Sequence, residues 1–126
     1  MEKEIRLKLI ELARQKTPWS YSQLNEQLLL NLNFKNSYDR ELIGDLLGEI
    51  SIHEFDNGRP LLSSLIIHKG PDREQGDGFY KLCEQLYGKK TWQQYKADES
   101  FEINEMKKCY VFWKNNDNYN KYKNDF

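Results

Sequence analysis

The sequence is poor in cysteine, and it has no long uninterrupted run of apolar residues. Its two cysteines, Cys83 and Cys109, are too far apart for a short-spaced metal motif and too few for a disulfide framework. The charged start, with Glu2, Lys3 and Glu4 after the first methionine, lacks the apolar segment of a secretory signal. The mean hydropathy of -0.90 argues against a membrane-spanning chain. We therefore expect a cytoplasmic protein whose cysteines are small core residues.

An excess of positive charge is also missing. The 19 lysines and arginines are balanced by 20 acidic residues, so the net charge is -1. A domain that binds nucleic acid by neutralising phosphates is usually clearly basic, so this chain would need a local basic patch. The length of 126 residues and the 38% hydrophobic content are sufficient for one core. We expect a single domain over residues 1–113 and a polar, flexible tail over residues 114–126.

Three helices are predicted in the first half of the chain. Residues 2–16 carry apolar side chains at helical spacing, and the following proline ends that helix. Ser20 begins a second helix over residues 21–30, because Gln23, three positions later, completes a capping box. A third helix over residues 38–52 has a continuous apolar arc at the helical period. That arc consists of Leu42, Ile43, Leu46, Leu47 and Ile50.

The stretch after the third helix predicts a wing. Residues 61–67 form an apolar, β-favouring run after the turn signal Asp56-Asn57-Gly58, which indicates a strand. The charged loop 68–76 predicts the wing tip, and residues 78–80 predict a short return strand that leads into a fourth helix. A helix capped by Asp77 is the alternative to that strand. The expected fold class is α+β: a winged helix-turn-helix with a short β-hairpin wing and additional C-terminal helices.

Several short motifs between Trp19 and Tyr80 follow one another in the order known from one family. They are Tyr21-Ser22-Gln23-Leu24, Leu42-Ile43-Gly44, Leu47-Gly48, and Pro60 at the start of the apolar strand. This order resembles the C-terminal winged-helix domain of the DNA alkylguanine alkyltransferases and alkyltransferase-like proteins. The run Gly58–Ser63, with Gly76–Tyr80, Glu105 and Trp113, also resembles a group of small uncharacterised bacterial proteins.

The chain departs from the alkyltransferase pattern at the residues that perform the chemistry. Where that family has Pro-Cys-His-Arg with the alkyl-accepting cysteine, this sequence has Pro60-Leu61-Leu62-Ser63. The family also places an arginine three residues before the helix glycine, and here that position is Glu41, with Arg40 one residue away. The resemblance therefore implies a binding fold without alkyl transfer, and it gives no support to base flipping.

Duplex DNA is the first expected partner, since this architecture most often binds it. In winged-helix proteins the third helix enters the major groove and the wing contacts the backbone. The residues predicted to bind nucleic acid are Arg40, Arg59, His68, Lys69 and Arg73. Asp72 and Glu74 in the same loop weaken this patch, and any polar loop of this kind carries such charges.

A protein partner is the alternative. The outer face of the third helix carries Glu41 and Asp45 one turn apart, which would repel a polyanion but suits a basic protein. Gly44 and Gly48 on the same face would let another backbone approach closely, or they would serve tight packing inside this domain. The chain would then be an adaptor or an immunity protein that neutralises a basic partner such as a nuclease.

A small hydrolase or nuclease is a third possibility. Its candidate residues are Glu49, His53, Glu54, Ser63, Ser64 and His68. Glu49 could orient His53 one turn later, and a serine on the adjacent strand could act as the nucleophile. Successive serines on a strand point to opposite faces, so they do not gather in one cleft. The sequence leads us to expect a non-enzymatic binding module, with no catalytic residue, metal site or cofactor.

Overall fold

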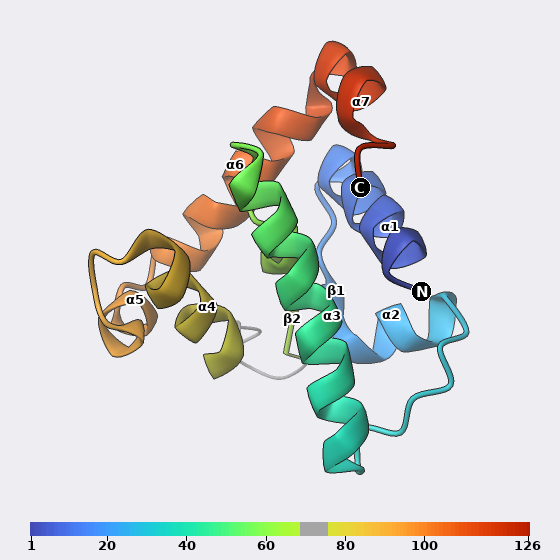
Figure 1. Ribbon diagram of the computed structural model, residues 1–126, viewed down its shortest axis with the longest axis vertical. Helices are drawn as coiled ribbons and strands as arrows, with labels where there is room; N and C mark the ends of the chain where they lie inside the picture. The colour runs from blue at the N-terminus through green and yellow to red at the C-terminus, as the bar shows by residue number, and fades with distance from the viewer. Residues whose placement is uncertain (69–75) are drawn as a thin grey trace.

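The computed structural model describes residues 1–68 and 76–126 (Figure 1). Within that part the chain is mostly helical, and the expected winged helix with a β-hairpin wing is wrong. The described sheet has two strands of two residues each, β1 (Trp19–Ser20) and β2 (Ile66–Ile67). They pair in parallel, with Trp19 opposite Ile66, whereas a hairpin wing needs antiparallel strands. Lys69 and Arg73, expected at the wing tip, lie outside the described residues.

Helices form the rest of the framework. They are α1 (Glu2–Gln15), α2 (Tyr21–Gln27), α3 (Ser37–Asp56), the 3-10 helix η1 (Leu62–Leu65), α4 (Asp77–Tyr87), α5 (Trp92–Ala97), α6 (Phe101–Lys114) and α7 (Asn116–Tyr122). Figure 1 shows α3 in the middle, with α1 and α2 on one side and α4 and α5 on the other. Helix α6 runs from the α5 end of the molecule to α7 beside α1, so the last helix returns to the first.

The capping signals in the sequence set the helix starts. The Ser20 hydroxyl accepts from the Gln23 backbone N–H at 3.1 Å, and the Gln23 side chain accepts from the Ser20 N–H at 2.8 Å. This reciprocal arrangement satisfies two backbone donors at the start of α2, as the predicted capping box requires. Thr91 and Gln94 form the same box at the start of α5. The predicted capping box at Ser20 is confirmed.

The apolar run over residues 61–67 folds differently from the expected strand. Leu62–Leu65 form η1, and only Ile66 and Ile67 are extended. Every residue of the run is buried, and a short, fully buried run fits a strand or a helical turn equally well. The turn is held to α3, because the Ser51 hydroxyl accepts from the Ser63 N–H at 3.0 Å.

Residues 78–80 are the first turn of α4, so the predicted return strand is wrong. The alternative of a helix that begins here is the one the structure adopts, with Asp77 as its first residue and Gly76 as its cap. Gly88 ends α4 in the left-handed region, at a φ of 65°. Apolar residues of α4 and α5 form a small second core with Leu61: Phe79, Tyr80, Cys83 and Tyr95.

The main core lies between α1, α3, η1 and α6. Its largest fully buried side chain is Trp113 of α6. On α3 the predicted inner arc faces this core: Ile43, Leu47 and Ile50 are buried, and Leu42 and Leu46 are half-buried. The outer face of α3 therefore stays available at the surface next to α4.

The polar segment over residues 114–126, predicted as a flexible tail, contains a helix. After Lys114 the chain turns at Asn115 and forms α7, whose start is capped by the Asn115 side chain, which accepts from the Asn118 N–H at 3.1 Å. Tyr119 and Tyr122 pack against the main core. This helix was hard to predict because the segment is polar, and its anchoring depends on residues far away in the chain.

Candidate functional site

The residues predicted to bind DNA do not form one basic surface within the described chain. Arg59 is buried, with an exposed fraction of 5%, and it donates to two carboxylates. Arg40 donates to the carbonyl oxygen of Phe34 at 2.6 Å, and the His68 ring lies 5.3 Å from the ring of Tyr21. The described residues of the set are thus separated and mostly occupied by contacts within the chain.

The residues predicted to bind a protein partner lie together. Glu41, Gly44, Asp45 and Gly48 all line one groove of about 470 Å³ between α3 and α4. Glu49 joins them at the next turn of the helix. Because residues three and four apart share a face of a helix, these side chains form a single rim. Within the described residues, Glu41 and Asp45 make no hydrogen bond or ion pair that would neutralise them.

The two glycines leave the groove open at its α3 wall. A Cβ atom built on Gly44 or Gly48 meets no described atom within 4 Å. Tight packing inside the domain, one of the two explanations considered for these glycines, is therefore not what they serve here. A glycine in a helix interior costs roughly 0.5–1 kcal/mol relative to alanine, so the open space comes at the expense of helix stability.

The opposite wall of the groove comes from α4 and is less charged. It includes Phe79, Lys81, Leu82 and Gln85. Leu47 and Ile52 of α3 add apolar surface, and the Nζ of Lys81 lies 5.2 Å from the ring centre of Trp92. The groove therefore combines an apolar lining with a rim on α3 that carries an excess of negative charge.

Negative charge extends from this rim towards the start of α1. A hydrogen bond with Glu49 raises the pKa of the Glu2 carboxyl, and partial burial and the negative charge of Glu49 act in the same direction. Two carboxyl groups that share a hydrogen bond hold a proton more tightly than isolated ones. A cation placed beside them would favour the ionised forms, so this end of the rim attracts positive charge most strongly when it is fully deprotonated.

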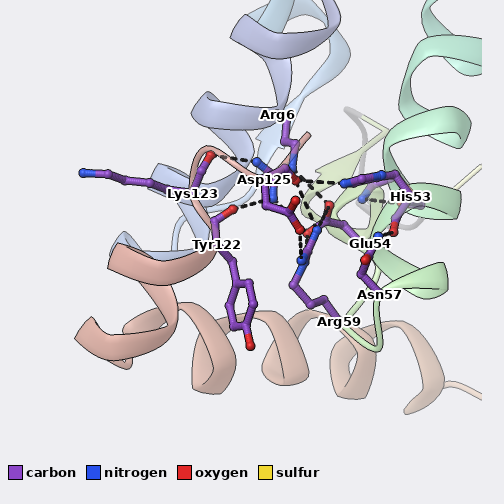
Figure 2. Close-up of polar contacts among 10 residues, drawn as sticks. Arg6, His53, Glu54, Asn57, Arg59, Tyr122, Lys123 and Asp125 are labelled. Carbon is purple, nitrogen blue, oxygen red and sulfur yellow. Dashed lines mark hydrogen bonds and ion pairs between the residues drawn. The ribbon is translucent and has the colours of Figure 1, made fainter.

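A buried ionic cluster lies near the C-terminal end of α3 (Figure 2). Glu54 of α3 is fully buried and accepts from both Arg6 and Arg59. The distances from the Arg6 and Arg59 Nε atoms to the nearest Glu54 oxygens are 3.0 Å and 2.8 Å. A second carboxylate, that of Asp125, accepts from Arg59 at 2.7 Å. We call these four residues the ionic cluster.

The sequence does contain a signal for this cluster. Arg6 is followed by Ile10 and Ala13 at helical spacing, and all three are buried on α1. Glu54 follows Ile50 by one turn on the buried side of α3. A charged residue at an apolar position of the helical pattern requires a buried partner of opposite charge. Arg59 reaches Glu54 because the chain turns sharply at Gly58, which has a φ of 71°.

The C-terminal residues complete the ionic cluster. The Arg6 guanidinium donates to the carbonyl oxygens of Lys123 and Tyr122 at 2.7 Å and 3.0 Å. A ring nitrogen of His53, Nε2, is 2.8 Å from the carbonyl oxygen of Asp125. Figure 2 shows these groups converging from α1, from α3 and from the end of the chain. The buried guanidinium groups thus obtain acceptors that Glu54 alone cannot supply.

Asp125→Asn should destabilise the protein at neutral pH and leave it unchanged in strong acid. The Arg59 guanidinium holds the pKa of the Asp125 carboxyl below its usual range. A lowered carboxyl pKa stabilises the fold above the unfolded value of about 3.9, and this contribution disappears as the pH falls through the folded value. Melting curves of both proteins from pH 7 to pH 2 should converge in acid, whereas Asp56→Asn should follow the original protein throughout. Parallel curves for Asp125→Asn at all pH values would contradict the ion pair.

Among the residues considered for catalysis, Glu49 and Ser63 line the α3–α4 groove, and the two histidines lie elsewhere. His53 contacts the C-terminal residues, and His68 lies against Tyr21. Ser64 is buried, with its hydroxyl 3.6 Å from the thiol of Cys109. Burial raises the pKa of the Cys109 thiol to about 12, so it is protonated at neutral pH. The part of the chain that the structure describes contains no group of three or more His, Cys, Asp or Glu residues placed to hold a metal ion.

Comparison with known proteins gives no relative from which a role could be transferred. No family model matches the chain, and no curated protein or solved structure is significantly similar to it. No helix in the described ranges has both the length and the apolar character that crossing a membrane requires. The resemblance to the alkyltransferases stays a prediction, and the function has to be inferred from the chain's own surface.

Proposed function

We propose that the protein is a protein-interaction module that binds a basic partner segment in the groove between α3 and α4. The observation that carries this is the combination of a glycine-lined opening with unneutralised carboxylates on the same helix face. Gly44 and Gly48 leave space that no described side chain fills. Glu41 and Asp45 stand beside that space without a partner of opposite charge among the described residues.

The shape and the charge of the groove favour the same kind of ligand. A helix or an extended segment could approach the α3 backbone closely at the two glycines, and its apolar side chains would meet Leu47 and Phe79. Lysine or arginine residues of the partner would pair with the carboxylate rim, which would speed up encounter and select against acidic partners. Duplex DNA is disfavoured, because the rim repels a polyanion.

Reversing the rim charge should abolish binding of a basic probe. The probe is a fluorescently labelled helical peptide of alanine and lysine, followed by anisotropy at about 50 mM salt, where surface electrostatics are least screened. The double variant Glu41→Lys, Asp45→Lys should bind about 100-fold more weakly, because each change replaces attraction by repulsion. The matched control, Glu26→Lys with Glu99→Lys, changes the net charge equally at exposed positions elsewhere and should bind almost normally.

The outcomes separate the groove from a general charge effect. Equal losses in both double variants would mean that only the overall field attracts the peptide, and the proposed groove would be wrong. Random-sequence duplex DNA, measured in parallel, should show no salt-sensitive binding. Tight DNA binding that weakens steeply between about 50 mM and 200 mM salt would instead replace the protein partner by nucleic acid.

Filling the groove should weaken binding while it strengthens the fold. Gly44→Ala with Gly48→Ala should raise the free energy of unfolding by roughly 1–2 kcal/mol, because alanine is the better helix former and each added Cβ has open space. The same methyl groups should lower the affinity for the peptide about tenfold by blocking close approach. Urea denaturation and peptide anisotropy measure the two effects. A double variant that is more stable and binds equally well would show that the glycines do not form the contact surface.

A further inference from the structure

The end of the chain is attached by polar contacts with Arg6, His53 and Arg59, and by two half-buried tyrosines that pack against the main core. We call residues 116–126 the C-terminal arm, and we call Arg6, His53 and Arg59 the arm site. No residue of α7 is buried, and Asp125 and Phe126 are exposed. The hydrogen bonds from the arm site go to backbone carbonyls and to one carboxylate of the arm. Elements with few buried apolar groups are those that open locally at the lowest cost.

The arm site is incomplete when the arm leaves. Arg6 and Arg59 are 1% and 5% exposed, and Glu54 provides one negative charge for two guanidinium groups. Asp125 supplies the second charge, and the Phe126 ring packs 5.0 Å from the ring of His53. Without the arm, the two guanidinium groups keep Glu54 as their shared carboxylate and can bind another carboxylate in place of Asp125. An occupant that matches the arm therefore presents a carboxylate next to an aromatic ring, together with the free backbone carbonyls at the end of a helix.

A single residue controls where the arm points. Asn115 is the only residue between α6 and α7, and its backbone is extended, with φ -69° and ψ 119°. Its side chain caps α7, and the Asn118 side chain donates to the carbonyl oxygen of Phe112 at 3.0 Å. If Asn115 became helical, α6 and α7 would join into one helix about 33 Å long, at about 1.5 Å per residue. The arm would then point away from its own site.

The elbow between α6 and α7 is not tightly packed on one side. A groove of about 1030 Å³ lies there, bordered by Phe112, Asn115 and Asn118 and, across from them, by Phe55. Val111 on the same surface is 75% exposed. The groove leaves room for the elbow to move. A second chain placed beside it would bury its apolar border.

We propose that two copies of this chain exchange their C-terminal arms. In the exchanged dimer α6 and α7 form a continuous helix, and the Asp125 carboxylate of each copy pairs with Arg59 of the other. A second copy is the occupant that fits, because the arm already presents the carboxylate, the ring and the carbonyls that the site binds. The exchange is reciprocal and closes the assembly at two copies. It also lies outside the α3–α4 groove, so it does not depend on the proposed binding function.

Variants at the elbow test the exchange in the full-length protein. Light scattering after gel filtration, from about 10 μM to 1 mM, should show a dimer whose fraction rises with concentration. Asn115→Ala removes the cap that ends the continuous helix, and it should lower the dissociation constant of the dimer about tenfold. Asn116→Pro should raise it at least tenfold, because proline suits the first helical position and keeps the preceding residue extended.

Two controls make the result decisive. Asn116→Ala removes the same hydrogen bond from Arg14 as the proline variant but leaves the elbow free, so it should dimerise like the original protein. In a dimer mixed from labelled and unlabelled copies, an isotope-filtered nuclear Overhauser effect should connect Phe126 of one chain with His53 of the other. A monomer for all variants up to about 1 mM, a dimer unaffected by Asn116→Pro, or a dimer without that intermolecular signal would each overturn the proposal.

Discussion

Replacing Glu54 by glutamine is expected to lower the free energy of unfolding by about 3–5 kcal/mol. Glu54 is fully buried and is the one carboxylate that Arg6 and Arg59 share. A neutral carboxamide of the same shape would leave the two guanidinium groups with an unbalanced buried charge, and its N–H₂ group would face their donors. The variant should therefore lose a large part of the total stability of a domain of this size, which is about 5–15 kcal/mol.

Urea denaturation followed by circular dichroism measures this loss. Glu41→Gln is the matched control on the same helix, since Glu41 is exposed, and its stability should change by no more than about 0.5 kcal/mol. If Glu54→Gln also lost less than about 1 kcal/mol, the guanidinium groups would have to be solvated. The ionic cluster would then be an open surface network instead of a buried one.

Trp113→Ala should cost about 3–5 kcal/mol, for a different reason. The Trp113 side chain is fully buried in the main core, where its ring packs edge-on against Phe112 at 4.9 Å. Alanine would leave a cavity between α1 and α6 that the surrounding helices could close only in part. Denaturation by urea, again followed by circular dichroism, gives the value, and Val111→Ala on the exposed side of α6 serves as the control.

A phenylalanine at position 113 separates the volume of the ring from its polar atom. The indole N–H of Trp113 has no hydrogen-bond partner among the described residues, and a buried unpaired donor costs about 1–3 kcal/mol. Trp113→Phe removes this donor and a smaller volume, so we expect a loss well below that of alanine. An equal loss for both variants would mean that the full width of the indole is needed to separate α1 from α6.

Local signals in the sequence predicted the helices better than they predicted the wing. The capping pairs, such as Ser20 with Gln23, determine backbone hydrogen bonds within three residues. A helix start can therefore be predicted from the neighbouring sequence alone. The apolar run over residues 61–67 offers no such local distinction. It became η1 followed by two extended residues. Ser51 of α3 binds the turn, and the two extended residues pair in parallel with the strand that begins at Trp19.

From the sequence, only the part of the groove that lies on one helix could be predicted. The helical period placed Glu41, Gly44, Asp45 and Gly48 on one face, and the structure has them on the rim of one groove. That the facing wall would be α4, and that the glycines would be left unpacked, depends on how separate helices dock. The ionic cluster was missed for the same reason, since Arg6 and Asp125 lie at opposite ends of the sequence.

The ionic cluster links residues that are synthesised far apart in time. Arg6 bonds to the carbonyl oxygen of Lys123, which is 117 positions later. Contacts of such long range close late, because the intervening chain has to be ordered first. While a ribosome is still extending the chain, Arg6 of α1 and Arg59, which follows α3, would therefore reach Glu54 without the other acceptors of the cluster. The ionic cluster of the nascent chain would remain incomplete until Asp125 has emerged.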